Sequence, residues 1–488
     1  MTTYDVLIIG AGCTGSLTAR ALSMYDVKVA VCEAGPDVAY GATRANSAIS
    51  HAGYDCECGT LKAKLNVRGT ELMPDLCRTL GVHYKRIGSH VIAFSDEDVE
   101  HIKMLYERGV KNGVPGLRLI DGEELRRMEP HVSKEAVASL WAPTAGVVSP
   151  YGLTIAAAEN AALNGVSFRL GYRVSSIEYK DGLWLVSNGK TPLAARYLVN
   201  AAGVGAPEIA GLMGDHDFPV VSKPSRGQYL VFDKQYGSMA NSTLFVTPSK
   251  KGKGILVSPT PGGNLITGPN AEPVDSADDK ETTAEGIAEI TAGGLRIMPD
   301  LPLRGVIKSF SGVRPNANQY DFYVQHAENL PHVIHAAAMS SPGLASSPAT
   351  AEYIVSLLRE DGLGLTEKKN YIPTRRKDGN PKRFVEMTNA EKAEAIRREP
   401  AYGRVICRCE TVTEGDILSA MRAPIPATTV DMLKHRLRAG MGRCQGGFCS
   451  PRVAELLAKE AGVTLDKVTQ FGGGSYLVLP RDGEEASE

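Results

Sequence analysis

The stretch Val6–Gly15, with the sequence VLIIGAGCTG, decides how the first part of the chain folds. It begins with four apolar residues of the kind that form a buried parallel strand, and three glycines follow with Gly-x-Gly-x-x-Gly spacing. Helical character over Leu17–Met24 and a second apolar strand over Val27–Cys32, ending at the acidic Glu33, come next. A strand, a glycine turn, a helix and a second strand ending in an acid together predict a dinucleotide-binding unit.

The residue types in this unit suit the binding of a dinucleotide for physical reasons. Gly10 allows the tight turn, Gly12 lets the backbone approach a pyrophosphate, and Gly15 lets the helix and the strand pack closely. The helix N-terminus offers free N–H groups and partial positive charge to the phosphates. The Glu33 carboxylate can accept hydrogen bonds from ribose hydroxyls. Neighbouring residues of the two turns are further predicted contacts: Cys13, Thr14 and Ala34.

The composition is that of an ordinary soluble globular protein. Its 488 residues suggest about three domains, and 43% are hydrophobic while 22% are charged. The net charge of -1 gives no reason to expect nucleic acid or anionic lipid as a partner. No apolar run approaches the roughly 18 residues of a membrane span, and no basic segment precedes the first apolar stretch as in a signal peptide. We therefore expect a cytoplasmic protein without a transmembrane segment, which would reach a membrane only through a partner.

Helical and strand patterns alternate along the next part of the chain. A helix is predicted over Leu61–Leu80, where leucines recur about every fourth residue. An Asp-Gly pair at 181–182, between the apolar runs Val174–Tyr179 and Leu183–Ser187, predicts a β-hairpin. Further strand-like runs between Pro and Gly turns predict an inserted antiparallel sheet: Gly227–Phe232, Gly254–Ser258 and Asn264–Thr267.

Four motifs favour FAD over NAD by resemblance. Gly41–Gly53, GATRANSAISHAG, resembles the flavin-wrapping loop of the D-amino-acid oxidase superfamily, in particular that of FAD-dependent glycerol-3-phosphate dehydrogenases and L-2-hydroxyglutarate oxidases. Asn200–Gly203 resembles the second FAD strand of these enzymes, and Ser311–Pro315 resembles their substrate-anchoring arginine motif. Ser341–Pro348 resembles the loop whose backbone faces the flavin pyrimidine ring. The resemblance implies further FAD contacts at Thr43, Arg44, Asn46, Ser47, Val174, Ala202, Gly203, Arg314, Gly343, Leu344, Ala345 and Ser346.

Three side chains are the candidates for chemistry on a secondary alcohol, which needs a hydride acceptor and a base. His51 ends the flavin loop and has a suitable pKa for a base or a substrate contact, although it could also only pack near the flavin. Arg314 could hold a carboxylate or a phosphate through its planar fork, or form a structural ion pair. Tyr229 is the third candidate, and Arg226 could line the same pocket.

The segment Gly53–Gly59, GYDCECG, departs from the resemblance. Glycerol-3-phosphate dehydrogenases tend to have a basic or aromatic segment here, and the hydroxyglutarate group differs again, so the substrate stays open. We expect the thiols of Cys56 and Cys58 to be incidental.

The last four of the nine cysteines form two close pairs, Cys407-x-Cys409 and Cys444-x4-Cys449. Soft thiolates favour an iron–sulfur cluster or zinc, and structural zinc more often uses Cys-x2-Cys pairs. The arrangement resembles the [2Fe–2S] domain of bacterioferritin-associated ferredoxins, which also ends the large subunits of anaerobic glycerol-3-phosphate dehydrogenases. Zinc and an empty site remain the alternatives.

Two helix starts are predicted beside these cysteines. Ser450 with Pro451 is a good start for a helix whose positive end would face Cys449. Thr411 with Glu414 is a candidate capping box just after Cys409.

These patterns give the fold class α/β and α+β. We predict a Rossmann-like FAD-binding domain over 1–85, 146–220 and 310–365, to which the strand, turn and helix pattern of Ala336–Leu358 belongs. A mixed or antiparallel sheet forms the substrate domain over 86–145 and 221–309. A basic, solvated linker over 366–403, containing a Thr388 and Glu391 capping box, leads to the helical [2Fe–2S] domain over 404–465. The remaining residues, 466–488, form a tail whose acidic end Asp482–Glu488 is expected to be disordered.

The predicted function is oxidation of a small anionic alcohol, with glycerol 3-phosphate first, by an FAD-dependent dehydrogenase. Electrons would pass from the flavin through the [2Fe–2S] cluster to a partner acceptor, a flavoprotein or a quinone-linked subunit. The basic linker and the cluster face are the candidate docking surfaces. A 2-hydroxy acid such as L-2-hydroxyglutarate, an amino acid or an imino acid are alternative substrates. An electron-transfer subunit without a substrate of its own is the rival from another class.

Overall fold

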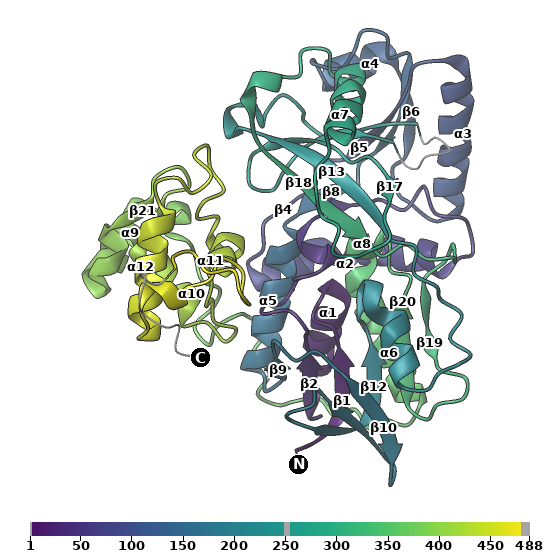
Figure 1. The fold of residues 1–488 in the computed structure, drawn as a ribbon. Helices are drawn as coiled ribbons and strands as arrows, with labels where there is room; N and C mark the ends of the chain where they lie inside the picture. The colour runs from purple at the N-terminus through teal and green to yellow at the C-terminus, as the bar shows by residue number, and fades with distance from the viewer. Residues whose placement is uncertain (1, 248–253, 480–488) are drawn as a thin grey trace. The chain divides into compact units, whose positions relative to one another are not determined.

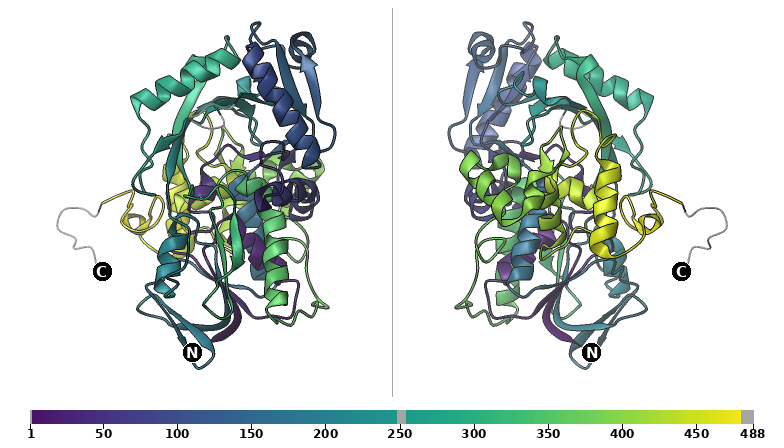
Figure 2. Two further views of the ribbon diagram at one scale, coloured as in Figure 1. Left: turned by 90° about the vertical axis from the view of Figure 1, so that its right-hand side faces the viewer. Right: turned by 90° about the vertical axis from the view of Figure 1, so that its left-hand side faces the viewer.

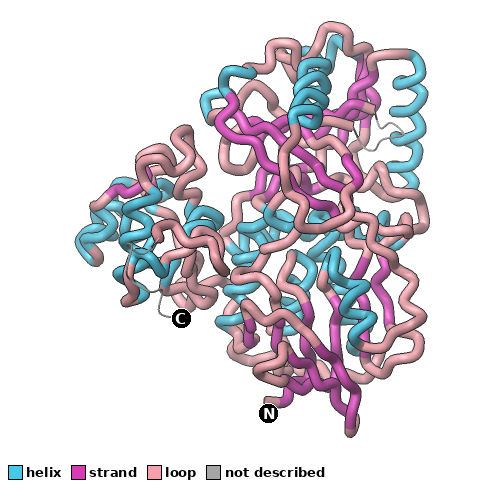
Figure 3. The backbone as a smooth tube through the Cα atoms, in the orientation of Figure 1, coloured by secondary structure: helices cyan, strands magenta, loops and turns pink. Residues whose placement is uncertain are grey.

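The computed structural model describes residues 2–247 and 254–479, so the acidic end of the predicted tail lies outside the described residues. The chain divides into two compact units between Pro373 and Thr374. The first unit contains large sheets flanked by helices, and the second is mainly helix and loop with one short strand pair (Figure 1, Figure 3). The predicted α/β and α+β class is therefore confirmed. None of the helices in the described part of the chain has the length and apolar character to cross a bilayer.

The eight-stranded sheet of the first unit is built on a parallel centre. Its middle strand begins before the glycine turn and pairs in parallel on both sides, and the predicted hairpin around 181–182 forms one edge. The order along the sheet is β10 (Ser176–Lys180), β11 (Leu183–Ser187), β12 (Leu193–Asn200), β1 (Thr3–Ile9), β2 (Val29–Cys32) and β9 (Ser167–Arg169), with β20 (Val333–Ala337) on β12 and β19 (Tyr323–His326) on β20.

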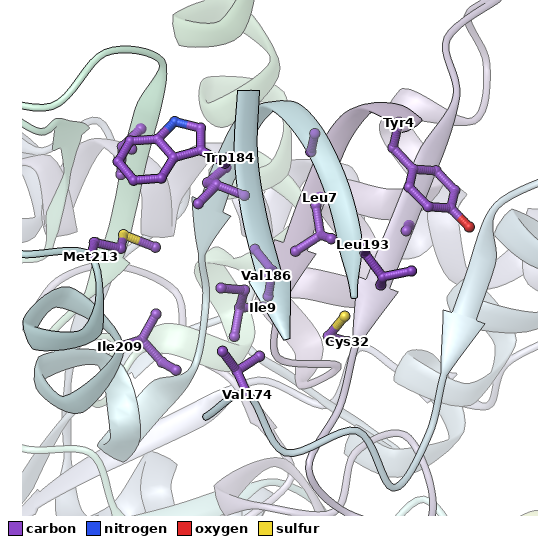
Figure 4. Close-up of a cluster of buried hydrophobic side chains, with 14 of the residues drawn as sticks. Tyr4, Leu7, Ile9, Cys32, Val174, Trp184, Val186, Leu193, Ile209 and Met213 are labelled. Atoms are coloured by element: carbon purple, nitrogen blue, oxygen red, sulfur yellow. The ribbon is translucent and has the colours of Figure 1, made fainter. Parts of the chain in front are cut away.

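A buried apolar cluster covers one face of this sheet, toward the hairpin (Figure 4). Leu7 and Ile9 alternate into it from β1, and Trp184 and Val186 alternate into it from β11. The Trp184 indole N–H donates to the Pro331 carbonyl oxygen at 2.9 Å, so its one polar atom is satisfied. Truncating a buried Trp of this kind costs about 3–5 kcal/mol.

Helices connect the parallel strands and pack on one another. The helix predicted over Leu61–Leu80 is present with those bounds as α2. Its buried residues include Leu65, Met73 and Leu80, but Leu72 and Leu76 are only half-buried. Gly69 of α2 lets this helix pack closely on α8, because a Cβ at Gly69 would overlap the Ala345 carbonyl. The other helices of this layer are α1 (Cys13–Leu22), α5 (Pro150–Leu163), α6 (Ala206–Leu212) and α8 (Gly343–Glu360).

The nine-stranded sheet separates two helical layers (Figure 2). One face packs on α3 (Asp96–Lys111) and the other on α7 (Ala284–Ile297) and α4 (Gly122–Met128). A third, small sheet consists of β3 (Ile49–Ser50), β8 (Gly146–Val148) and β4 (Tyr84–Lys85). The nine strands are β17 (Glu272–Pro273), β13 (Ser225–Phe232), β16 (Leu265–Gly268), β15 (Leu256–Pro259), β14 (Thr243–Val246), β5 (Ser89–Ala93), β7 (Ala138–Ala142) and β6 (Arg118–Asp121), with β18 (Val306–Arg314) on β13.

The segment 366–403, for which we predict a solvated linker, contains the boundary between the two units. Its first residues pack on the first unit, because the side-chain amides of Asn160 and Asn164 both donate to the Ile372 carbonyl oxygen at 2.8 Å. Its later residues belong to the second unit, where the Phe384 N–H donates to Asp416 at 2.8 Å. Most charged side chains of this segment are exposed, as in a solvated linker, while its backbone is bonded to packed neighbours at both ends.

The second unit surrounds a small apolar core. Its first helix, α9 (Asn389–Arg398), starts with the predicted Thr388 and Glu391 capping box. The predicted helix start at Ser450 is also confirmed, since α12 begins there with Pro451 in its first turn. The other elements are η5 (Phe384–Glu386), η6 (Pro400–Gly403), β21 (Val405–Cys407), β22 (Val412–Thr413), α10 (Glu414–Met421), α11 (Val430–Leu437) and η7 (Leu465–Lys467).

Candidate functional sites

The glycine turn packs too tightly for side chains. Gly10 has φ +104°, and a Cβ there would overlap the Ala201 carbonyl, while a Cβ at Gly15 would overlap the Gly10 carbonyl. Gly12 is the N-cap of α1, and as a glycine it has no side chain to cap the helix. The first turn of α1 therefore keeps N–H groups for an anion, as a pyrophosphate site requires.

Glu33 lies at the end of β2, directly beside this turn. Its carboxylate accepts hydrogen bonds from the N–H groups of Ala11 at 2.8 Å and Gly35 at 2.7 Å. Burial raises the pKa of Glu33, and the two N–H donors oppose that rise. Each carboxylate oxygen has a further lone pair, so ribose hydroxyls could still donate to it. Its contact with ribose remains a prediction, as do contacts of the adjoining Ala34.

The predicted flavin loop meets the glycine turn through Thr43. The Thr43 hydroxyl accepts a hydrogen bond from the Cys13 N–H at 3.1 Å, and burial raises the pKa of the Cys13 thiol. Asn46 clamps the loop: its amide donates to the Thr43 carbonyl at 2.9 Å, and its side-chain oxygen accepts from the Ala48 N–H at 2.9 Å. Arg44 stacks on Tyr40 with 4.2 Å between guanidinium carbon and ring centre. Asn46 thus has a structural role in shaping the loop.

The N-terminus of α8 supplies a direct test of whether a cofactor fits. This turn comprises Gly343, Leu344, Ala345 and Ser346, and its N-cap Pro342 makes no side-chain capping bond. The Ser346 hydroxyl is completely buried and has no hydrogen-bond partner among the described residues. Because such a group is costly to leave unpaired, it fits a polar atom of a bound ligand. The residues present are therefore consistent with a bound flavin.

Two other predicted contacts lie at strand ends. Ala202 and Gly203 form the turn after β12, next to Gly10. The side chain of Val174 packs in the apolar cluster beside the sheet, so only its backbone could contact a cofactor. Thr14 is buried in the first turn of α1.

The strands β13 and β18 bring the two predicted residues Tyr229 and Arg314 to one face. Ser225 pairs with Arg314, and Tyr229 pairs with Phe310, so these side chains share one face of the sheet. This face touches the flavin loop, because a Cβ at Gly312 would overlap the Ala45 carbonyl. We call it the substrate face, defined by Ser225, Gly227, Tyr229, Phe310, Gly312 and Arg314.

Tyr229 and Arg314 are both held by several contacts on the substrate face. The Tyr229 hydroxyl lies 3.1 Å from the Ser47 hydroxyl, and its ring stacks on Phe310 with 4.6 Å between centres. Burial raises the pKa of Tyr229, while Arg314 and Ser47 oppose the rise, so the phenol stays neutral. Arg314 donates to the Asn270 carbonyl at 2.9 Å. Among the described residues, Arg314 donates to the neutral Ser225 hydroxyl and Asn270 carbonyl, so its charge is available to an anionic ligand.

His51 contacts β14, a strand in the interior of the same sheet. Its ring stacks on Phe245 of β14 at 5.8 Å between centres, and its carbonyl accepts from Asn66 at 2.7 Å and Thr70 at 2.6 Å. Phe245 pairs with Leu256 of β15, and Leu256 pairs with Gly268 of β16. Gly268 in turn lies against Tyr229 of β13. Three strand spacings, roughly 14 Å, thus separate the strands of Tyr229 and Phe245. Sequence reasoning missed Phe245 and Gly268, because only the strand register brings them here.

Arg226 does not line this pocket, which corrects the expectation. Adjacent residues of a strand point to opposite faces, so Arg226 faces away from Tyr229. It is buried and forms ion pairs with Glu272 at 2.9 Å and with Asp279. Its role is to tie the segment after β16 to β13.

His335 is a core residue of β20. It is fully buried, with its two ring nitrogens 2.9 Å from an oxygen of Asp215 and 3.1 Å from the side-chain amide of Asn200. Burial lowers the pKa of His335. Cys56 is buried, and the Cys58 thiol donates to the Arg108 carbonyl at 3.7 Å.

The four C-terminal thiols gather as two pairs in the second unit. The sulfurs of Cys409 and Cys444 are 3.8 Å apart. Two thiolates about 2.3 Å from one tetrahedral metal would be about 3.8 Å apart, so this pair fits a shared metal atom. Cys407 and Cys449 form the other pair: a hydrogen bond from the Cys449 thiol lowers the pKa of Cys407 to about 6 and raises that of Cys449.

No group of three or more His, Cys, Asp or Glu side chains within residues 2–247 and 254–479 is arranged to hold one metal ion. Two separate thiol pairs are what a two-iron cluster requires. Backbone N–H groups of Phe448 and Gly446 lower the pKa of Cys444, and Cys449 is the N-cap of α12. These positive dipoles would stabilise an anionic cluster.

The predicted capping box at Thr411 and Glu414 is wrong. Thr411 has φ +51° in the turn between β21 and β22, so it cannot start a helix. Thr413 and Asp416 form the capping box of α10 instead, and Glu414 pairs with Arg404 at 2.6 Å. Both patterns satisfy the capping rule, and the strand pairing of Val412 selects the later one.

Comparison with known proteins agrees with both sites. Residues 5–357 match the family model for FAD dependent oxidoreductases, and residues 405–459 match the model for the BFD-like [2Fe-2S] binding domain. A glycerol 3-phosphate dehydrogenase of Caloramator mitchellensis is 42% identical over 475 residues, which are 97% of this chain and 98% of that protein. A glycerol 3-phosphate oxidase of Mycoplasma genitalium is 32% identical over 76% of this chain and 98% of its own length.

A solved structure supports the same assignment. The dithionite-reduced L-alpha-glycerophosphate oxidase of Mycoplasma pneumoniae with FAD bound has a TM-score of 0.73 and 31% identity, covering 77% of this chain and 98% of that one. The C-terminal match indicates a [2Fe–2S] cluster in place of zinc. The chain therefore belongs to the FAD dependent oxidoreductases of the D-amino-acid oxidase type, as a flavoprotein dehydrogenase with an added [2Fe–2S] domain.

Proposed function

We propose that the enzyme oxidises glycerol 3-phosphate at its secondary alcohol. The observation that carries this proposal is the 42% identity to a glycerol 3-phosphate dehydrogenase over 97% of this chain, which spans both units. A likeness limited to the FAD-binding motifs would support only the oxidoreductase class. The substrate face adds a physical reason, because it offers one guanidinium beside neutral partners to a small anion.

The proposed roles of Arg314, His51 and Tyr229 follow from charge and position. Arg314 binds the phosphate of the substrate through its fork. His51, which α2 holds by its carbonyl, accepts the hydroxyl proton. Tyr229 stays protonated and donates a hydrogen bond toward the substrate or Ser47. FAD, when bound, supplies the hydride acceptor, and the glycine turn, the flavin loop and the first turn of α8 would hold it.

We further propose that electrons leave through the four-cysteine site to a partner acceptor. The cluster would carry one electron at a time, so one alcohol oxidised to a ketone releases two protons and reduces two one-electron acceptors. An enzyme that used oxygen directly would need only the flavin and access for oxygen. The partner and any attachment to a membrane surface are parts of this proposal.

A 2-hydroxy acid is the second candidate substrate. The human L-2-hydroxyglutarate dehydrogenase is 29% identical over 55% of this chain. Arg314 would suit a carboxylate as well as a phosphate. Amino and imino acids remain further alternatives on the same ground, and a subunit without a substrate is the remaining rival.

Anaerobic bleaching of the flavin distinguishes these candidates. The purified protein is mixed without oxygen with glycerol 3-phosphate, L-2-hydroxyglutarate, glycine or proline, and flavin absorbance is followed in time. We expect bleaching at a catalytic rate with glycerol 3-phosphate and at least 100-fold slower bleaching with the others. Faster bleaching by L-2-hydroxyglutarate would transfer the assignment to the second candidate. No bleaching with any compound would favour the electron-transfer subunit.

A further inference from the structure

The loop between the last two cysteines carries an unusual side chain. Phe448 lies directly before Cys449 and is 86% exposed, the largest exposed fraction among the large apolar side chains of the described residues. The Phe448 N–H is hydrogen-bonded to the Cys444 sulfur. This backbone hydrogen bond does not require an aromatic side chain. An exposed ring costs hydrophobic free energy that only burial against another surface can recover.

The thiols beside Phe448 are unequally covered. Cys407 and Cys449 are each 2% exposed, whereas Cys409 is exposed and Cys444 is half-buried. One edge of the four-cysteine site therefore reaches the surface of the second unit, and it is the edge formed by the pair with sulfurs 3.8 Å apart. Electron transfer to another protein would be fastest from this edge.

The exposed charges next to the thiols are cationic. Arg408 lies between Cys407 and Cys409, Arg443 directly precedes Cys444, and both side chains are exposed. The acid nearest to these cysteines, Glu410, is buried and paired with Arg438 at 2.8 Å. Arg452, in the first turn of α12, adds a third exposed cation, although it pairs with Glu455 at 2.8 Å.

We propose that Phe448, flanked by Arg408 and Arg443, is the anchor on which an acidic one-electron carrier protein docks to take electrons from the cluster. An aromatic anchor in the middle with charges at the rim is the usual anatomy of a protein interface. Cations around the anchor would steer an acidic carrier and repel a basic one. This inference rests on the proposed exit of electrons through the four-cysteine site, and it names the chemistry of the acceptor.

The test compares two soluble cytochromes of similar size, one acidic and one basic, as acceptors for the anaerobic holoenzyme. Reduction is started once with dithionite and once with glycerol 3-phosphate, and a small uncharged quinone serves as an acceptor that needs no docking. At low ionic strength we expect the acidic cytochrome to be reduced at least about tenfold faster than the basic one. The preference should shrink at roughly 0.5 M salt, where charges are screened.

Two variants separate the anchor from the charges. Phe448→Ala should slow reduction of the acidic cytochrome about tenfold and leave the quinone rate unchanged. Arg408→Glu with Arg443→Glu should invert the preference between the two cytochromes. Ile396→Ala and Arg398→Glu on α9, a helix without cysteines, are the matched controls and should behave as the unmodified protein.

Several results would overturn the inference. Equal rates with both cytochromes, or rates unchanged in the variants, would show that the face does not dock the acceptor. Slower reduction of the cluster by substrate in Phe448→Ala, measured without any acceptor, would assign the face to the chain's own flavin unit. A change in oligomeric state in the same variant would assign it to a second copy. A cytochrome preference after dithionite but none after glycerol 3-phosphate would instead refute the proposed substrate and leave the docking face intact.

Discussion

The glycine turn and the substrate face solve the problem of holding a ligand in opposite ways. The glycine turn is local: Glu33 reaches back to Ala11 over 22 residues of chain. The substrate face is assembled from distant segments, since Tyr229 meets Ser47 across 182 residues. A local site depends on which residues can fit, while a composite site depends on the register of strands, which reverses every side chain when it shifts by one residue. Changes in the turn should therefore affect FAD content, and changes in the face should affect rates.

The largest effect is expected at His51. His51→Ala should slow bleaching of the flavin by glycerol 3-phosphate by roughly 10²–10⁴-fold, because the alcohol proton loses its acceptor. FAD content should not change. Stopped-flow absorbance measures the rate, and His131→Ala, a surface histidine of the same unit, is the control. A normal rate would reduce His51 to a packing role.

The glycine turn should respond in cofactor content instead. In Gly15→Ala the new methyl group would overlap the Gly10 carbonyl, which overpacks the turn by about 3 kcal/mol and weakens FAD binding about 100-fold. The matched control is Gly211→Ala on α6, where a Cβ meets nothing within 4 Å. Flavin content after gel filtration is the measurement. Full retention of FAD by Gly15→Ala would show that FAD binding does not depend on the close fit of the glycine turn.

Arg314→Ala should mainly weaken substrate binding. Loss of a charged hydrogen bond costs about 1.5–3 kcal/mol, which raises KM roughly 10- to 150-fold. Arg314→Lys should recover part of this loss because it restores the charge without the fork. Steady-state kinetics separate KM from kcat, and Arg127→Ala on the surface of α4 is the control. An unchanged KM would mean that the phosphate binds elsewhere.

The smallest effect is expected for Tyr229→Phe, which removes one hydroxyl and keeps the ring on Phe310. Loss of one neutral hydrogen bond costs about 0.5–1.5 kcal/mol, so kcat/KM should fall only a few-fold. Because burial raises the pKa of Tyr229, we expect its phenol to stay protonated during turnover and the pH profile to keep its shape. A basic limb that disappears in the variant would instead make Tyr229 a titrating catalytic group.

The same contrast explains what the sequence could predict. The bounds of α2, the FAD-dependent oxidoreductase family and the [2Fe–2S] domain follow from patterns of neighbouring residues, and those predictions are confirmed. The errors arose where tertiary packing decides. Arg226 was placed in the pocket without knowledge of strand register, and Thr411 was chosen over Thr413 without knowledge of the strand pairing at Val412. The segment 366–403 has the composition of a connector, although its backbone is bonded within both units.

Some roles on the substrate face remain predictions, since no sequence pattern encodes them. The ring of Phe245 under His51, and Gly268 between Leu256 and Tyr229, come from four strands whose order along the chain differs from their order in the sheet. The resemblance pointed to His51 and Arg314 individually. Their spacing across the sheet could be obtained only from the fold.

The most direct test of the whole account is reoxidation of substrate-reduced protein. The holoenzyme, with about one FAD and two irons per chain, is reduced anaerobically by glycerol 3-phosphate and then mixed with either oxygen or the acidic cytochrome. The cytochrome should reoxidise the protein at the catalytic rate and oxygen far more slowly, and Cys449→Ser should lose the cytochrome reaction while keeping FAD and its bleaching by substrate. Reoxidation by oxygen at the catalytic rate, equally fast in Cys449→Ser, would contradict the claim that electrons leave through the four-cysteine site.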